Sequence, residues 1–216
     1  MSRINRKPAV ADLHRQQILK AAEVLFTEKG YEHTRIEDIS RASGYSRRTL
    51  YAYYQSKEDI LCHIVEKGLL LLKQELESAL EQPGNFMDRY RAVCMALWNY
   101  QQSCPHSLEQ VNRAKAGELE TGGPLPVIGR ILNLGTEINR LMAGFLQKGK
   151  DEGAVRPDVH PEMTVMILWS SLTALFTLVQ TKGVFLTRQF ALSQEDFLEY
   201  GCRQIAGSIL KEEGIR

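Results

Sequence analysis

The sequence predicts an all-α protein in which an N-terminal three-helix head is joined by a long fourth helix to a C-terminal helical bundle. Apolar residues recur at three- and four-residue spacing along most of the chain, which is the pattern of helices with one buried face. Glycine and proline clusters separate these stretches, and none shows the two-residue alternation of a half-buried strand. The 216 residues are enough for two domains, which we expect at residues 1–56 and 57–216.

The head begins with a basic, polar segment, residues 1–10, which we expect to form a loose arm. Residues 12–29 then show a helical apolar pattern, and Gly30 is expected to end that helix because glycine accepts the left-handed conformation of a helix end. The expected core of the head consists of Leu25, Phe26, Ile36, Ile39 and Leu50.

A second helix is expected directly after this first one. Thr34 is expected to cap it, with Glu37 three residues later completing a capping box. Its C-terminal end is expected at Ser43-Gly44.

A third helix, residues 47–54, follows the glycine turn, with Ser46 as its cap. Leu50 and Tyr54 are four residues apart and are expected to face inward, which turns the two arginines of its first turn outward. Two short helices across a glycine turn, the second carrying exposed Arg and Tyr, predict a helix-turn-helix that places its second helix in the DNA major groove.

The remaining helices form the body. Gln82-Pro83-Gly84 and Thr121-Gly122-Gly123-Pro124 are the strongest breaks between them. After Gly183 we expect a loop of about ten residues, because glycine commonly ends helices. The expected helices span residues 57–81, 86–103, 107–118, 125–151, 161–183 and 193–213.

Charge and cysteine content fit a cytoplasmic protein with a basic head. Residues 1–56 contain ten Lys and Arg against six Asp and Glu, whereas the rest contains seventeen against twenty. The four cysteines, Cys62, Cys94, Cys104 and Cys202, show no C-x-x-C spacing and are expected to be reduced thiols. Residues 163–181 carry no charge, and we interpret them as a helix buried on both sides and not as a membrane span.

The stretch from Ile18 to Leu61 resembles the DNA-binding head of the tetracycline-repressor (TetR) family. The matching pieces include Phe26 with Gly30-Tyr31, Ala42-Ser43-Gly44, and Ser46 with Thr49-Leu50-Tyr51. Members of this family are homodimeric repressors in which a ligand in the body alters the spacing of the two heads. The resemblance therefore implies a sequence-specific regulator that binds a palindromic operator in double-stranded DNA and is released by a small-molecule effector, with no enzymatic activity and no cofactor.

The resemblance also implies which residues contact DNA. Arg47 and Arg48 match base-reading positions, and Arg suits bidentate bonding to guanine. Tyr51 matches a residue that reaches bases or sugar, while Tyr45 stands where a small aliphatic residue is common. The other expected contacts are mainly to phosphates. The complete expected set is Thr34, Arg35, Tyr45, Ser46, Arg47, Arg48, Thr49, Tyr51, Tyr53 and Lys57.

The last two helices are expected to form the dimer interface. By resemblance they pair with their counterparts in a second copy as a four-helix bundle, which is an isologous contact. Small residues on these helices would let another helix approach closely. The expected interface residues are Ser170, Ala174, Thr177, Gly201 and Ser208.

An effector pocket is expected inside the body. One row of residues on the uncharged helix could face the fifth helix and residues 125–151, and apolar walls with a few polar groups describe a ligand site as well as a core. The expected pocket residues are Trp98, Asn99, Gln102, Met142, Phe145, Met166, Trp169, Thr173 and Phe176.

Two other protein classes compete with a ligand-responsive regulator. An enzyme is disfavoured because no nucleophile elbow, phosphate loop or zinc spacing occurs. The alternative is a thiol- or metal-responsive DNA-binding sensor with no organic ligand. Against it, Cys94 and Cys104 would lie about 15 Å apart on a continuous helix, too far for a disulfide. Cys62-His63 with Glu66 is the nearest approach to a metal cluster, and no metal site is expected.

Overall fold

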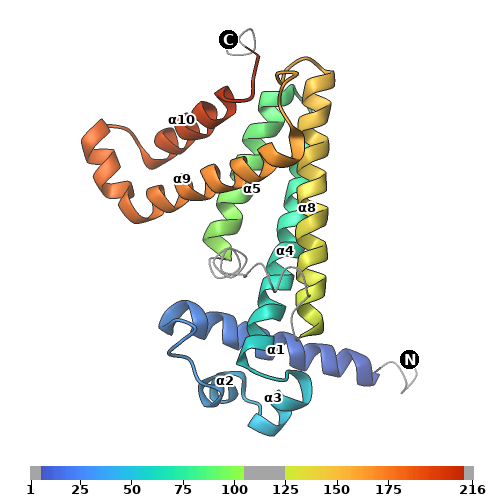
Figure 1. Cartoon of the computed structure of the whole chain (residues 1–216). Helices are drawn as coiled ribbons and strands as arrows, with labels where there is room; N and C mark the ends of the chain where they lie inside the picture. The colour runs from blue at the N-terminus through green and yellow to red at the C-terminus, as the bar shows by residue number, and fades with distance from the viewer. Residues whose placement is uncertain (1–5, 105–124, 212–216) are drawn as a thin grey trace. The chain divides into compact units, whose positions relative to one another are not determined.

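The computed structural model describes residues 6–104 and 125–211. Within these ranges the regular secondary structure is α-helical, and one isolated β-bridge joins Val155 and Leu210. The all-α prediction is therefore confirmed for the described part of the chain (Figure 1). The helices are α1 (Arg6–Lys29), α2 (Ile36–Ser43), α3 (Arg47–Tyr53), α4 (Lys57–Glu81), α5 (Phe86–Ser103), α8 (Pro126–Asp151), α9 (Pro161–Phe190) and α10 (Gln194–Gly207).

The chain divides into two compact units, each described here by itself. The N-terminal unit is Met1–Leu70 with Cys104–Asn133, and the C-terminal unit is Leu71–Ser103 with Leu134–Arg216. Helices α4 and α8 contribute residues to both units. The boundary expected at residue 56 stays a prediction.

Buried apolar side chains of α1 to α4 form the core of the N-terminal unit. Four of the five core residues predicted from the sequence are buried, and Ile36 is partly buried against them. Helix α1 begins at Arg6, so the predicted loose arm is wrong for residues 6–10, while residues 1–5 lie outside the described ranges. The helix predicted at residues 107–118 also lies outside them.

The largest correction concerns the end of α9. The helix continues through Gly183 to Phe190, and only Ala191–Ser193 joins it to α10. A glycine inside a helix costs only about 1 kcal/mol relative to alanine, and here its missing side chain leaves room for Gln194, which a Cβ would meet at 2.6 Å. Helix α10 ends at Gly207, earlier than predicted.

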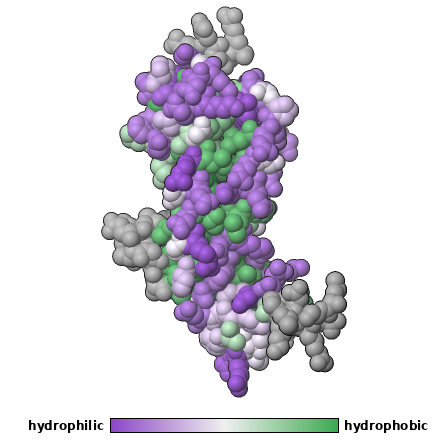
Figure 2. All heavy atoms as spheres, turned by 90° about the vertical axis from the view of Figure 1, so that its right-hand side faces the viewer, coloured by the Kyte–Doolittle hydropathy of each residue, from purple (hydrophilic) through white to green (hydrophobic). Residues whose placement is uncertain are grey.

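Helix α9 is buried on one face and exposed on the other, which corrects the prediction that both sides are buried. Val165, Leu168, Leu172 and Phe176 lie in the core, while Ile167 on the opposite face is 64% exposed. Of the described helices, α9 alone has the length and composition to cross a membrane, a test that the core helix of a soluble protein also passes. On the face drawn in Figure 2, apolar patches reach the surface between polar ridges.

The end of α8 packs closely against the start of α5 at Gly149. The ring of Phe86 stacks on that of Phe145, with centroids 4.5 Å apart and planes 4° from parallel. Gly149 lies beneath this pair, and a Cβ added there would stand 2.5 Å from Cε2 of Phe86 and 2.7 Å from Cγ2 of Val155. The close approach therefore depends on the absence of a side chain.

We expect Gly149→Ala to lower the free energy of unfolding by about 1–3 kcal/mol, because overpacking forces buried groups apart. The matched control is Gly144→Ala in the same helix, where an added Cβ meets no atom within 4 Å. That change should leave stability unchanged or raise it by up to about 1 kcal/mol. Urea unfolding followed by circular dichroism measures both, and equal effects of the two substitutions would contradict the packing account.

Candidate nucleic-acid interface

The turn between α2 and α3 is held by hydrogen bonds of local residues. Gly44 ends α2 in the left-handed conformation, at φ 75°. The hydroxyl of Ser46 accepts a hydrogen bond from the backbone N–H of Thr49 at 3.1 Å, so the predicted cap of α3 is confirmed. The hydroxyl of Ser40 donates to the carbonyl of Tyr45 at 2.6 Å across the turn. These contacts set the direction in which α3 leaves the turn.

The predicted cap of α2 is wrong. Thr34 is buried, and its hydroxyl donates to the carbonyls of Gly30 at 2.8 Å and Leu25 at 3.3 Å. It thereby satisfies carbonyls left over at the end of α1. The N-cap is Arg35, whose backbone N–H donates to the carboxylate of Asp38 at 3.1 Å. The Thr34 hydroxyl points inward, so its phosphate contact stays a prediction, whereas Arg35 is exposed.

Helix α3 presents Arg47, Arg48 and Tyr51 to solvent, as predicted, while Leu50 lies in the core. Arg47 donates to the carboxylate of Glu37 at 2.8 Å, and both side chains are more than half exposed. Backbone hydrogen bonding at Glu37 and the contact with Arg47 lower the pKa of that carboxyl. Exposed ion pairs contribute little to stability, so Arg47 can exchange this partner for another at small cost.

Tyr45 and Tyr53, which were both expected to contact DNA, pack against α1 and so help to position α3. The hydroxyl of Tyr53 lies 3.0 Å from Nδ1 of His14 on α1, and the ring of His14 lies 4.8 Å from that of Tyr45. Tyr45 also donates a short hydrogen bond to Gln17. Neither α1 residue was predicted from the sequence, although His14 lies one turn before the buried Ile18 on the same side of the helix. The DNA contacts of Tyr45 and Tyr53 stay predictions, whereas their contacts with α1 are observed.

Lys57 has a structural role in addition to the phosphate contact predicted for it. Its Nζ donates to the carbonyls of Tyr31 at 2.8 Å and Thr34 at 3.0 Å, and lies 4.1 Å from the centre of the Tyr31 ring. Carbonyl oxygens offset the unfavourable position of a cation in the first turn of a helix. An ammonium has three donors, so one remains for a phosphate. Thr49 is half-buried, with its hydroxyl 2.9 Å from that of Ser46.

The predicted effector pocket is mostly core. Phe176 packs edge-on against Trp98 with centroids 5.5 Å apart, and the indole N–H of Trp169 donates to Asn139 at 2.9 Å. The space lined by Met142 and Trp169 is about 10 Å³, too small for an organic ligand. Thr173 donates to the carbonyl of Trp169. Met166 and Gln102 are exposed, and Phe145 stacks on Phe86.

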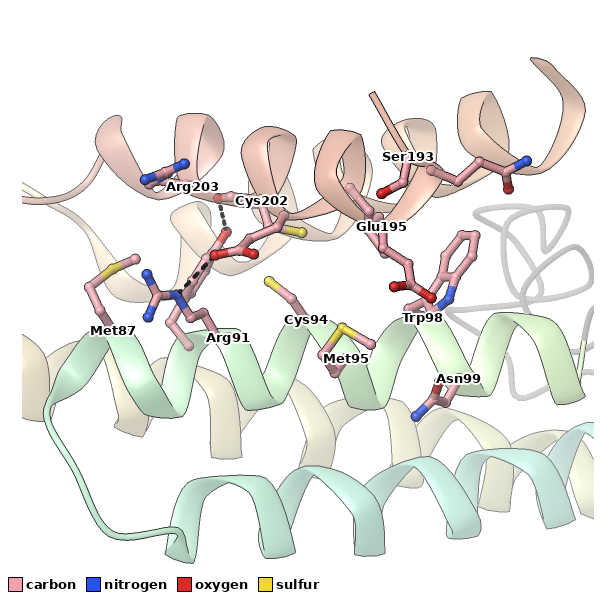
Figure 3. Close-up of a pocket in the computed structure, with 14 residues that line it drawn as sticks. Met87, Arg91, Cys94, Met95, Trp98, Asn99, Ser193, Glu195, Cys202 and Arg203 are labelled. Carbon is pink, nitrogen blue, oxygen red and sulfur yellow. Dashed lines mark hydrogen bonds and ion pairs between the residues drawn. The ribbon is translucent and has the colours of Figure 1, made fainter. Parts of the chain in front are cut away.

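A larger opening lies between α5 and α10 in the C-terminal unit, and we call it the α5–α10 groove (Figure 3). Its volume is about 930 Å³. Of the predicted pocket residues only Trp98 and Asn99 line it, because the predicted pocket included no residue of α10. The signal was present: Leu198, Cys202 and Ala206 recur every four residues and are buried. The lining includes Met87, Cys94, Met95, Trp98, Leu198 and Cys202.

The residues predicted for the dimer interface fall into two groups. Ser170, Ala174, Thr177 and Ser208 are exposed and therefore accessible to a second copy. Gly201 instead packs inside the chain, since a Cβ there would stand 2.7 Å from Cδ1 of Leu175. Its close approach is to α9 of the same chain.

We expect Lys57→Met to lower the free energy of unfolding by about 1–2 kcal/mol, because two carbonyls lose their donor. Lys20→Met, at an exposed position on α1, is the matched control and should have no measurable effect. Thermal or urea unfolding compares the two. Unchanged stability of the Lys57 variant would mean that the lysine serves DNA alone.

Comparisons with known proteins agree with this geometry. The family model described as "Bacterial regulatory proteins, tetR family" matches residues 18–64. HTH-type transcriptional regulator HbdR of Aromatoleum sp. (strain CIB) is 33% identical over 93 residues, which are 43% of this chain and 39% of HbdR. HTH-type transcriptional repressor KstR2 of Mycolicibacterium smegmatis is 22% identical over 156 residues, 72% of this chain and 74% of KstR2. Both are named as regulators and not as enzymes.

The fold is also shared with a solved structure. The TetR family transcriptional regulator PfmR from Thermus thermophilus has a TM-score of 0.64 and 23% identity, covering 88% of this chain and 97% of PfmR. The match to HbdR, in contrast, spans well under two thirds of that relative's length. The family model falls on α1 to α4, where the helix-turn-helix lies. The helix-turn-helix domain at residues 18–64 therefore belongs to the TetR family of bacterial regulatory proteins.

Proposed function

We propose that this protein is a cytoplasmic transcriptional repressor that binds a palindromic operator as a homodimer and is released by a small-molecule effector. The observation that carries the proposal is a helix-turn-helix whose second helix, α3, turns two arginines and a tyrosine to solvent. KstR2, a relative over most of the chain, is named as a repressor, which supports the sign of regulation.

Base reading is assigned to the exposed face of α3. A guanidinium can bond both O6 and N7 of guanine, and such a bidentate pair discriminates by about 1–3 kcal/mol. In the free protein Glu37 holds Arg47, whereas Arg48 has no ion pair among the described residues. Arg48 and Tyr51 are therefore ready to meet base edges directly, and Arg47 joins them by leaving Glu37. Arg35, Ser46, Thr49 and Lys57 are proposed to set the register on phosphates.

The homodimer proposal is supported by the exposed face of α9. Several large apolar side chains on this face are exposed, and the small residues Ser170, Ala174 and Thr177 lie between them. Exposed large apolar side chains gathered on one helix face mark an interaction site, and a self-complementary helix pair gives a closed dimer. The large apolar residues are Met163, Met166, Ile167, Val184 and Phe185. A monomer by sedimentation equilibrium at micromolar concentration would refute this part of the proposal.

The α5–α10 groove is the proposed effector site. Its volume of about 930 Å³ falls within the roughly 300–1,000 Å³ that ligand pockets occupy. Methionine and tryptophan side chains supply apolar walls, and Asn99, Glu195 and Arg203 supply polar groups (Figure 3). An effector acts only if it binds the DNA-free and DNA-bound arrangements with different affinity. The core space around Met142 and Trp169 is too small for this role.

The proposed function is tested by a DNA-binding titration at two salt concentrations. It compares the fragment upstream of the protein's own gene with random DNA, for the wild type and for Arg47→Ala/Arg48→Ala. We expect specific binding by the wild type, an affinity that falls steeply with salt, and a loss of about tenfold to a thousandfold in the variant through its lost bidentate contacts.

The control variant is Arg140→Ala/Arg188→Ala, which removes the same charge from exposed positions outside the head. It should bind the upstream fragment as the wild type does. Equal weakening by both variants would mean that the arginines of α3 act only through net charge. Weak, equal binding of both fragments by all three proteins would contradict the assignment of α3 as a sequence reader at this DNA.

A further inference from the structure

Two thiols from distant parts of the sequence meet in the α5–α10 groove. Cys94 lies on α5 and Cys202 on α10, and Figure 3 shows their sulfur atoms facing each other between the two helices. The two thiols influence each other's titration, which raises the pKa of Cys94 and lowers the pKa of Cys202. The groove thus holds a pair of adjacent sulfurs that sequence spacing could not reveal, since 107 positions separate them.

We propose that Cys94 and Cys202 form a hydroperoxide-reactive pair that closes to a disulfide between α5 and α10. Disulfide formation itself does not depend on the proposed function. The regulatory consequence does, because it rests on the protein binding DNA as a dimer.

The backbone around the pair is held in place on both helices. Tyr90 lies one turn before Cys94, and its hydroxyl donates to the carbonyl of Cys202 at 3.1 Å. This bond fixes α10 against α5 at the level of the two sulfurs. Both cysteines are otherwise buried, at 3% and 5% exposure, so the groove that they line is the route by which a water-sized oxidant reaches them.

The two sulfurs are chemically unequal. The interaction with Cys94 lowers the pKa of Cys202, because a neighbouring thiol favours its thiolate. The interaction with Cys202, together with burial, raises the pKa of Cys94. Since the thiolate is the nucleophile, Cys202 is the sulfur that attacks peroxide, and Cys94 is the thiol that resolves the product.

The reaction proceeds in two balanced steps. The Cys202 thiolate attacks one oxygen of the hydroperoxide, so an S–O bond forms, the O–O bond breaks, and the peroxide is reduced to water or an alcohol after taking up one proton. Cys94 then attacks the resulting sulfenic acid. The S–S bond forms as the S–O bond breaks, and the departing hydroxide takes the Cys94 proton to leave as water. Two thiols are oxidised, and the hydroperoxide is the only oxidant required.

Closure would shift α10 and carry α9 with it. A disulfide requires the two sulfurs to approach to about 2.05 Å, which pulls α10 toward α5. On its other side α10 packs tightly on α9, where Gly201 lies under Leu175 with no space for a side chain. Because α9 carries the proposed dimer surface, oxidation would change how two copies pair and so weaken DNA binding.

The first test maps cross-links in the full-length protein after treatment with hydrogen peroxide, without reducing agent. We expect a Cys94–Cys202 cross-linked peptide that dithiothreitol reverses, with Cys62 and Cys104 remaining as unoxidised thiols. Cys62→Ser and Cys104→Ser are the matched controls and should still form the cross-link. No cross-link between Cys94 and Cys202, or oxidation confined to Cys62 or Cys104, would overturn the proposal.

The second test separates the roles of the two sulfurs. In Cys94→Ser, a sulfenic acid at Cys202 should accumulate and be trapped by dimedone, whereas Cys202→Ser should give no adduct at Cys94. Circular dichroism verifies that both variants are folded, and mapping of the wild type remains decisive if either is not. An adduct at Cys94 alone would reverse the assigned roles and overturn the proposal as stated.

The regulatory consequence is measured separately, with DNA that the reduced protein binds. We expect the oxidised wild type to bind about tenfold more weakly, within the usual range of coupling between two sites, and oxidised Cys104→Ser to weaken equally. Unchanged affinity of cross-linked protein would overturn the regulatory part. Failure of the reduced protein to bind any DNA would instead refute the proposed function and leave the cross-link result standing.

Discussion

The burial of Leu50 and Tyr54 is the interaction on which the candidate DNA-reading surface depends. Helix α3 has seven residues, and a helix of this length is not stable by itself in water. Leu50 packs in the same core as Ile18 and Phe26 of α1, and the hydroxyl of Tyr54 donates to the carbonyl of Arg15 at 3.2 Å. Once these two side chains are seated, the opposite side of α3 can only face solvent. The orientation of the arginines therefore follows from the core.

Polar contacts refine the orientation that the core imposes. His14 and Gln17 hold Tyr53 and Tyr45 from α1, and Lys57 ties the start of α4 to the loop before α2. Several positions that the family resemblance assigns to DNA thus also hold the helix-turn-helix together. A substitution at such a position changes stability as well as affinity, so DNA-binding data on these variants need a stability measurement beside them.

The parts of the fold that were predictable from sequence are those governed by neighbouring residues. The Ser46 cap, the Gly44 turn and the inward pair on α3 each depend on residues within four positions of one another, and all three are confirmed. The cap predicted at Thr34 was wrong because its hydroxyl donates to carbonyls at the end of α1 and not to the following helix. The helix end predicted at Gly183 was wrong because this glycine leaves room for the side chain of Gln194, a contact that depends on how α9 and α10 pack.

The α5–α10 groove was the least predictable feature, for the same reason. Trp169 and Phe176 have the residue types of a pocket, yet they fill the core, and no local pattern distinguishes the two uses. The groove arises where α10 lies beside α5, as does the meeting of Cys94 with Cys202. Both follow from tertiary packing between segments about a hundred residues apart. Spacing along the sequence tests only cysteine pairs that lie close together in the chain.

The measurement that tests the central claim most directly is repeated selection of bound sequences from random double-stranded DNA by the full-length protein. A dimer whose heads each read one major groove should enrich an inverted repeat. Its half-sites should be centred one helical turn apart, roughly 34–36 Å, or a multiple of it, with guanine at positions that Arg47→Ala or Arg48→Ala relaxes. Enrichment of a single, unrepeated site would contradict the dimer, and no enrichment at all would contradict sequence reading by α3.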